Sequence, residues 1–150
     1  MRLRELFDPD LINLRLEGTS RDEILKELVS MLGLDKKSAK TLHKMFWRRQ
    51  NLGSTGVGNG IAFVFTRTNF VDRLRLGFGR QPEGVDFKAM DKKPVFHFFL
   101  IVGPVHDPAN EYLPVFGKLA QFSREPDFGG LLSKPETAEE FLDLIDSRDA

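Results

Sequence analysis

A glycine-rich stretch of the sequence, STGVGNGIAFVFTR at residues 54–67, has the composition of a loop that serves a ligand or a reaction. Glycine leaves backbone N–H groups accessible and tolerates positive φ, so such a loop can approach an anion closely. The apolar run that follows carries Phe63 and Phe65 where a catalytic loop would end in a reactive group. Because a benzyl ring has no lone pair, no exchangeable proton and no charge, Phe65 cannot act as an acid, a base or a nucleophile.

Three histidines remain as candidates for nucleophilic or acid–base chemistry near neutral pH. His97 lies in the apolar run VFHFF, which favours a packed or edge-facing residue with a satisfied ring over a reactive one. His106 follows Pro104 after that run, close to where α/β folds place sites, although exposed loop histidines are common. His43 lies beside Leu42, at the edge of an expected helix face. The chain has no cysteine and the histidines lack the spacing of a zinc site, so we expect no metal and no cofactor.

The direction of the glycine-rich loop argues against a nucleotide site. The loop leads from an expected helix into an expected strand, whereas the dinucleotide fingerprint and the P-loop both lead from a strand into a helix. GVGNG also lacks the third-glycine spacing and a following Gly-Lys-Ser/Thr. The sequence therefore favours tight turns with positive φ.

The composition indicates one soluble domain over residues 1–150. Hydrophobic residues make up 41% of the chain and charged residues 29%, which is typical of a globular protein. Basic and acidic residues both total 22, so no excess of positive charge is available for phosphates and we expect no nucleic-acid partner. No stretch approaches the ~20 apolar residues that cross a bilayer, and the opening has no signal-peptide pattern. With the absence of cysteine, these features predict a cytoplasmic protein without a membrane-inserted segment.

Two helices are expected before the glycine-rich loop. Ser20 and Glu23 form a capping box at the start of the first helix, and Gly33 ends it. The second helix is expected over residues 37–49, which brings Arg49 close to the loop.

Strands are expected over residues 11–17, 61–67, 72–80 and 94–104. The alternation in the third of them is expected to direct three apolar side chains inward and three basic ones outward: Leu74, Leu76 and Phe78 against Arg73, Arg75 and Arg80. Two more helices are expected, one over residues 110–123 with Pro114 in its first turn, and one after Thr137, where Glu140 completes a capping box. This order predicts an α/β fold, a single domain with a mixed central sheet flanked by helices on both faces.

The stretch LGSTGVGNGIAFVFTR resembles the signature of the fructose/mannitol-type enzyme IIA domain of the bacterial phosphotransferase system, including its nitrogen-regulatory branch. That signature is close to L-G-S-T-G-I-G-N-G-I-A-I-P-H-G-R. Downstream, PEGVDFKAMDKKPVFHFFLIVGP is similar to the family's Pro-Glu-Gly-Ile-Asp-Trp turn and central strand. The resemblance spans nearly the whole chain and implies the mannitol/fructose-type enzyme IIA fold.

In that family the histidine of the Pro-His pair takes a phosphoryl group from the phosphocarrier HPr and passes it on or uses it as a signal. The resemblance places Val64 and Phe65 at this pair, and Tyr112 at a second histidine of the family site. Because a benzyl ring cannot be phosphorylated, the resemblance implies a degenerate member of the family.

The rest of the family loop is retained. The resemblance carries these residues onto the family site: Arg49, Ser54, Thr55, Gly58, Asn59, Gly60 and Arg67. Backbone N–H groups and two guanidinium groups could still receive an anion or a carboxylate from a partner. Each of these residues also has a structural interpretation, as a cap, a left-handed turn or an anchor for the loop.

The sequence thus predicts a non-catalytic regulatory or protein-binding module, whose partner is an HPr-like phosphocarrier, a transporter or a sensor kinase. Phe63, Phe65 and Phe70, ringed by arginines, would form an interaction patch or a plug of core side chains. One alternative is an active phosphocarrier that accepts on His106 or His97. The other is a sensor of small anions or metabolites that uses the glycine-rich loop.

Overall fold

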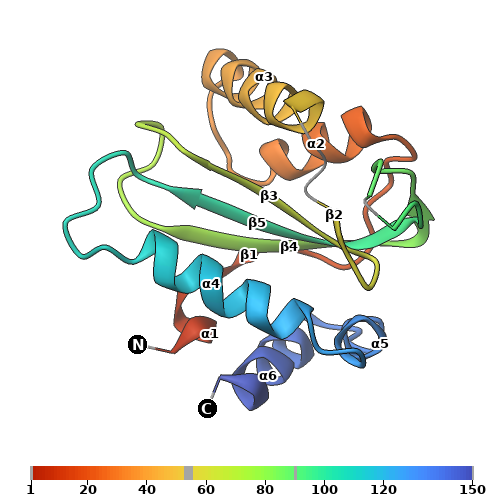
Figure 1. The fold of residues 1–150 in the computed structure, drawn as a ribbon. Coiled ribbons are helices and arrows are strands. Elements are labelled where there is room, and N and C mark those ends of the chain that lie inside the picture. Colours follow the sequence, from red (N-terminus) through yellow and green to blue (C-terminus); the bar gives the residue numbers. More distant parts are fainter. Residues whose placement is uncertain (1, 53–55, 90, 150) are drawn as a thin grey trace.

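The computed structural model describes residues 2–52, 56–89 and 91–149. Within these residues a five-stranded sheet forms the middle of three layers, in the order β1-β4-β5-β3-β2 (Figure 1). Its strands are β1 (Phe7–Asn13), β2 (Gly56–Gly58), β3 (Ile61–Arg67), β4 (Arg75–Val85) and β5 (Val95–Gly103). The pairs β1·β4 and β3·β5 are parallel, and β4·β5 and β2·β3 are antiparallel. The predicted mixed central sheet is confirmed.

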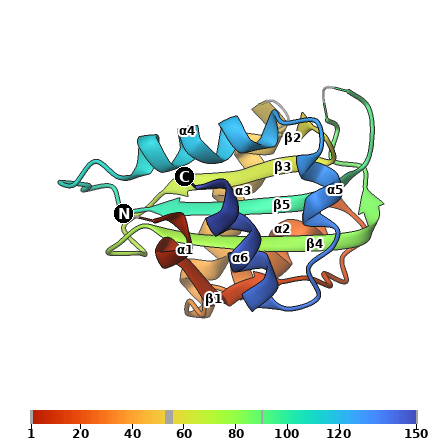
Figure 2. The same ribbon diagram turned by 90° about the horizontal axis from the view of Figure 1, so that it is seen from below.

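Helices cover both faces of the sheet, as predicted. One face carries α2 (Arg21–Ser30) and α3 (Lys36–Leu52). The opposite face carries four helices, which Figure 2 shows from below: α1 (Leu3–Leu6), α4 (Tyr112–Ser123), α5 (Phe128–Leu132) and α6 (Ala138–Arg148). No helix of the described part of the chain is both long enough and apolar enough to span a bilayer.

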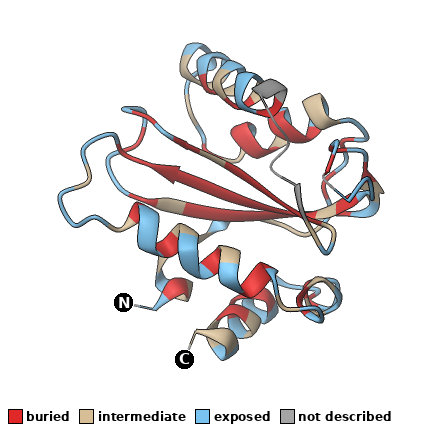
Figure 3. Ribbon diagram, in the orientation of Figure 1, coloured by how far each residue is buried: buried red, intermediate tan, exposed pale blue. Residues whose placement is uncertain are grey.

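The central strand β5 separates two apolar clusters because neighbouring side chains on a strand point to opposite faces. Phe98 and Leu100 pack in the cluster beneath α2 and α3, whereas Phe99 and Ile101 pack against α4, α5 and α6. All four side chains are completely buried. Figure 3 shows the result, a buried sheet between two partly exposed helical layers.

Both predicted capping boxes supply the expected backbone cap. The Ser20 hydroxyl accepts a hydrogen bond from the Glu23 N–H at 3.2 Å, and the Thr137 hydroxyl accepts one from the Glu140 N–H at 3.1 Å. Each bond satisfies an N–H group that has no partner within the helix. Pro114 lies in the first turn of α4, as expected.

Several expectations about the elements were wrong, and one of them concerns the third strand, which was expected over residues 72–80 and covers Arg75–Val85. The first strand covers Phe7–Asn13 instead of 11–17, because the chain leaves β4 at Asn13 and continues as a loop. Helix α3 extends beyond Arg49 to Leu52. Arg80, expected to face outward, is only 7% exposed. The reason is the strand's period of two, which places Arg80 on the same face as Leu76 and Phe78.

Candidate functional site

The second half of β3 lies at an edge of the sheet. Among the described residues, β2 pairs only with the start of β3, at Ile61 and Ala62. Phe65 therefore has a neighbouring strand on one side only, where it lies opposite Ile101 of β5. The Phe65 ring is half-buried and contacts the ring of Phe116 edge-on, with centroids 4.7 Å apart. Phe65 is therefore held by α4 and remains accessible at the sheet edge.

Two arginines lie over the aromatic rings at this edge. The Arg49 guanidinium, from α3, is 4.5 Å from the centroid of the Phe65 ring. The Arg67 guanidinium, at the end of β3, is 4.5 Å from the centroid of the Tyr112 ring. Both distances are within the range of a cation–π interaction. We call Arg49, Phe65, Arg67, Tyr112 and Phe116 the cation–aromatic cluster.

The two guanidinium groups of the cluster have no carboxylate within salt-bridge distance among the described residues. Tyr112 is 6% exposed, and burial raises the pKa of its hydroxyl, although Arg49 and Arg67 act in the opposite direction. The hydroxyl is consequently protonated at neutral pH. The cluster can thus attract an anion, but it holds no ionised nucleophile.

The loop after β5 fixes the position of Tyr112. The Asp107 carboxylate accepts hydrogen bonds from the N–H groups of Glu111 and Tyr112, at 3.3 and 3.1 Å. The bond from Tyr112 is the main reason that the pKa of Asp107 is lowered, and the Arg67 charge adds to it. A Cβ on Gly103 would lie 2.5 Å from the Tyr112 ring, so only glycine allows this close approach.

Exposed apolar side chains lie at the same end of the sheet as the cluster, where β3 and β5 end. Among the described residues, the large hydrophobic side chains that remain exposed are Phe70, Val105 and Leu113, at 37%, 57% and 62%. Phe70 follows β3, Val105 follows β5 and Leu113 belongs to the first turn of α4. We call these three residues the apolar rim.

The histidines lie in three different environments. His43 is 2.8 Å from the Asp22 carboxylate, between α3 and α2. His106 is exposed in the loop that follows β5, at the same end of the sheet as the cluster. His97 is 2% exposed and lies at the other end of β5, opposite Ile61. Burial, reinforced by Arg80, lowers the pKa of His97 to about 4.

The expectation that the His97 ring is satisfied was wrong for one nitrogen. Nε2 is 3.4 Å from the Ser133 hydroxyl, but Nδ1 is buried without a hydrogen-bond partner among the described residues. The ring also stacks on Phe78, with centroids 6.0 Å apart.

The glycine-rich loop lies partly outside the described residues, which include neither Ser54 nor Thr55. Gly58, Asn59 and Gly60 have φ values of +93°, +57° and +71° and form the turn between β2 and β3. The Asn59 amide donates to the carbonyls of Ser123 and Glu125, both at 3.0 Å, which anchors this turn to the end of α4. The predicted tight turn is confirmed, and it lies at the opposite end of β3 from Phe65.

The structure thus brings together four of the residues expected at the site, namely Arg49, Phe65, Arg67 and Tyr112, and separates Gly58–Gly60 from them. Phe116 was not expected there. Its position four residues after Tyr112 was the available signal, because residues i and i+4 share a helix face. Among the described residues, no group of three acidic or histidine side chains could hold a metal ion.

The arrangement of sheet and helices defines a known class of α/β protein, the phosphotransferase IIA fold. The structure of the nitrogen regulatory protein IIA-Ntr from Neisseria meningitidis superimposes with a TM-score of 0.84 and 28% identity, over 95% of this chain and 98% of that one. IIA mannitol from Escherichia coli, at a TM-score of 0.72 and 18% identity, covers 92% of this chain and 97% of its own and supports the fold alone.

The sequence comparisons define the family. A family model for the "Phosphoenolpyruvate-dependent sugar phosphotransferase system, EIIA 2" matches residues 5–148, so the chain belongs to this family. The nitrogen regulatory protein of Bradyrhizobium diazoefficiens is 25% identical over 97% of this chain and 95% of its own length. The fructose-specific EIIABC component of Bacillus subtilis is 24% identical over 99% of this chain, which spans 24% of that relative.

Proposed function

We propose that this chain is a non-catalytic IIA-like module of the nitrogen-regulatory type, which regulates a protein partner by binding it. The observation that carries the proposal is the cation–π contact between Arg49 and Phe65, with 4.5 Å between the guanidinium and the ring centroid. The family motif gives the Phe65 position to the phosphoryl acceptor. A ring packed between Arg49 and Phe116 supplies no lone pair for that reaction.

The other groups of the cluster also support a non-catalytic role. The Tyr112 hydroxyl is the remaining oxygen nucleophile there, and its raised pKa keeps it protonated. Arginine side chains are never deprotonated at neutral pH and act as hydrogen-bond donors only. The cluster therefore has the charge to hold a phosphoryl group or a carboxylate and lacks a group to accept it covalently.

The proposed docking surface consists of the cation–aromatic cluster and the apolar rim. An interface of this kind, with aromatic and arginine anchors next to apolar side chains, is typical of protein-binding hot spots. The partner should offer an anionic group for Arg49 and Arg67 and an apolar contact for Leu113. The candidate partners are an HPr-like phosphocarrier, a transporter domain and a sensor kinase, which this chain would bind in the cytoplasm. A solved complex of Escherichia coli mannitol IIA with phosphorylated IIB, 19% identical, has the same fold with a TM-score of 0.73.

Binding to three partners tests this proposal: the cognate HPr-like carrier in its phosphorylated and unphosphorylated forms, the transporter domain and the sensor kinase. Calorimetry is expected to show binding that Arg49→Glu with Arg67→Glu weakens at least ~10-fold, because two favourable charge contacts become repulsive. Leu113→Asp should weaken it as well. Lys40→Glu with Lys44→Glu is the matched control, since both are exposed residues of α3 and the net charge changes by the same amount. If the carrier, the transporter domain and the kinase all fail to bind, or bind the variants equally well, the docking surface is wrongly placed.

A second candidate function is supported by the place of His106. This exposed side chain lies at the same end of the sheet as the cluster, so a donor docked there would be within reach of it. The function would then be that of a phosphocarrier with His106 as the acceptor. His97 is less suited, because its side chain is buried at the other end of β5, away from the docking surface.

A further inference from the structure

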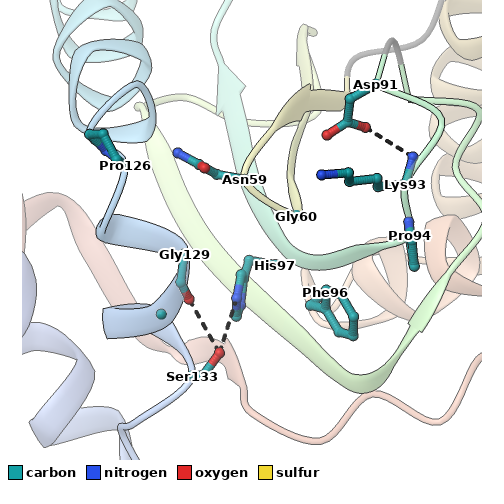
Figure 4. A pocket seen from close by; sticks show the side chains of 11 residues that line it. Asn59, Gly60, Asp91, Lys93, Pro94, Phe96, His97, Pro126, Gly129 and Ser133 are labelled. Carbon is teal, nitrogen blue, oxygen red and sulfur yellow. Dashed lines mark hydrogen bonds between the residues drawn. The ribbon is translucent and has the colours of Figure 1, made fainter.

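A double hollow lies at the opposite end of the sheet from the cation–aromatic cluster, on the same face. Four residues of strand, about 13 Å, separate Ile61, beside the hollow, from Phe65. The larger part has a volume of about 560 Å³ and the smaller part about 270 Å³. Both parts are lined by Phe96, His97 and Ser133, so they adjoin each other. In Figure 4, Ser133 lies between the Gly129 carbonyl and His97 in the larger part.

Arg80 brings a buried positive charge to the smaller part. It is directly opposite His97 in the β4·β5 pair and only 7% exposed. Its Nε donates to the Leu14 carbonyl at 3.2 Å and its Nη1 to the Leu132 carbonyl at 3.0 Å. Its Nη2 donates to no described residue, and no described carboxylate is within salt-bridge distance of the guanidinium. Burial of a guanidinium without a counter-ion is costly, so an anion bound beside it would be strongly stabilising.

The neighbouring side chains add to this positive field. Arg15 and Lys134 line the same part of the hollow, both exposed, and Glu136 is the one carboxylate among its described lining residues. The larger part is lined by both Lys93 and Asp91, so the charges there offset each other (Figure 4). The smaller part is thus cationic, which favours small anions over neutral or cationic ligands.

Ser133 and His97 supply polar atoms where the two parts adjoin. The Ser133 hydroxyl is 3.2 Å from the Gly129 carbonyl and 3.4 Å from His97 Nε2. Ser133 is exposed and lines both parts, so its hydroxyl is the polar group that a ligand hydroxyl can reach, with the buried His97 ring directly behind it. Phe96 and Pro126 line the larger part, which can therefore hold the less polar portion of a ligand.

We propose that this double hollow, here called the Arg80 pocket, binds a small hydroxylated anion, whose phosphate or carboxylate group pairs with Arg80 and whose hydroxyl forms a hydrogen bond with Ser133, next to His97. The site is separate from the docking surface and does not depend on it. Its ligand would be a sugar-phosphate-like or hydroxy-acid-like metabolite of the size of the hollow. The Arg80 guanidinium that would hold the ligand is itself fixed by its hydrogen bonds to the Leu14 and Leu132 carbonyls.

Amide and imidazole NMR spectra of the full chain, titrated with glycerophosphate, lactate and inorganic phosphate at matched ionic strength, test the Arg80 pocket. We expect shifts at the amides of Phe96, His97 and Ser133 and at the His97 ring nitrogens. Binding of glycerophosphate alone identifies a phosphate ligand, binding of lactate alone identifies a carboxylate ligand, and binding of both shows that the pocket accepts either group. If none of the three probes shifts these signals, or if the shifts map to Arg49 and Arg67, the proposal is overturned.

A variant of exposed residues keeps this test independent of folding. Arg80→Met is unsuitable on its own, because it removes the buried charge together with two hydrogen bonds to backbone carbonyls and thereby destabilises the fold. Arg15→Glu with Lys134→Glu changes only exposed side chains, and it should raise the Kd of the bound probe at least ~10-fold by reversing the local charge. Lys44→Glu, on the other face of the sheet, should leave the Kd unchanged. Equal effects of the double variant and of Lys44→Glu would show non-specific attraction and overturn the pocket.

Discussion

His97 makes the stability of the fold depend on pH at the scale of a single residue. Burial first, and the Arg80 charge second, lower its pKa from 6.5 to about 4. In the unfolded chain the ring titrates near 6.5, so between these values the unfolded state takes up a proton that the native state does not. The contribution of His97 to stability is therefore fully present above pH 6.5 and is lost as the pH falls toward 4.

We expect this loss to amount to about 3 kcal/mol, since each pKa unit corresponds to ~1.36 kcal/mol. Urea unfolding of the original chain and of His97→Phe, at neutral pH and near pH 4, measures it. The free energy of unfolding of the original chain should fall by about 3 kcal/mol more than that of the variant, which keeps a ring to stack on Phe78. An equal fall in the two proteins would show that His97 is not buried as the structure has it.

Single residues also show what the sequence could and could not predict about the site. Phe65, Arg49 and Arg67 were expected from the motif, and the structure places them in one cluster. Arg80 was assigned to the exposed face because basic residues usually lie there, although its register with Phe78 indicated the opposite. The Arg67–Tyr112 contact depends on the path of the loop between β5 and α4, which places Tyr112 beside the end of β3. No local sequence pattern predicts this path.

At the scale of elements, the short helix α5 is positioned by one glycine. A Cβ on Gly129 would clash with the carbonyl oxygen of Asn59, in the β2–β3 turn, whereas a Cβ on Gly130 would have no atom within 4 Å. We expect Gly129→Ala to lower the free energy of unfolding by about 1–3 kcal/mol, because backbone cannot yield as a side chain can. Gly130→Ala should be neutral or stabilising by up to ~1 kcal/mol. Urea unfolding of both variants decides the matter, and equal stabilities would contradict the close packing of α5.

The elements differ in how well the sequence predicts them. The helices that begin at Ser20 and Thr137 were predicted because their caps are local signals, and the structure contains both cap bonds. Strand β1 was predicted four residues too late. Its sequence, FDPDLIN, has Pro and Asp within it, and its pairing with β4 overrides that unfavourable composition. The short elements α1, β2 and α5 depend on tertiary contacts and were not predicted.

At the scale of the whole molecule, the two ends of one sheet face carry different chemistry. The carboxyl ends of β3 and β5 carry the cation–aromatic cluster with its exposed apolar rim. The other end carries the cationic Arg80 pocket. The fold belongs to a family whose members handle phosphoryl groups, but the described residues of the cluster offer arginine and aromatic side chains. These side chains support the proposal that the chain binds a partner and does not transfer a phosphoryl group.

Intact-mass measurement after incubation with phosphoenolpyruvate, enzyme I and the cognate HPr-like carrier tests the central claim most directly. Phe65→His with Val64→Pro, which restores the family's Pro-His pair, serves as the positive control. We expect the original chain to keep its mass and the double variant to gain one acid-labile phosphoryl group. Stoichiometric phosphorylation of the original chain, abolished by His106→Ala or His97→Ala, would contradict the account and establish a phosphocarrier.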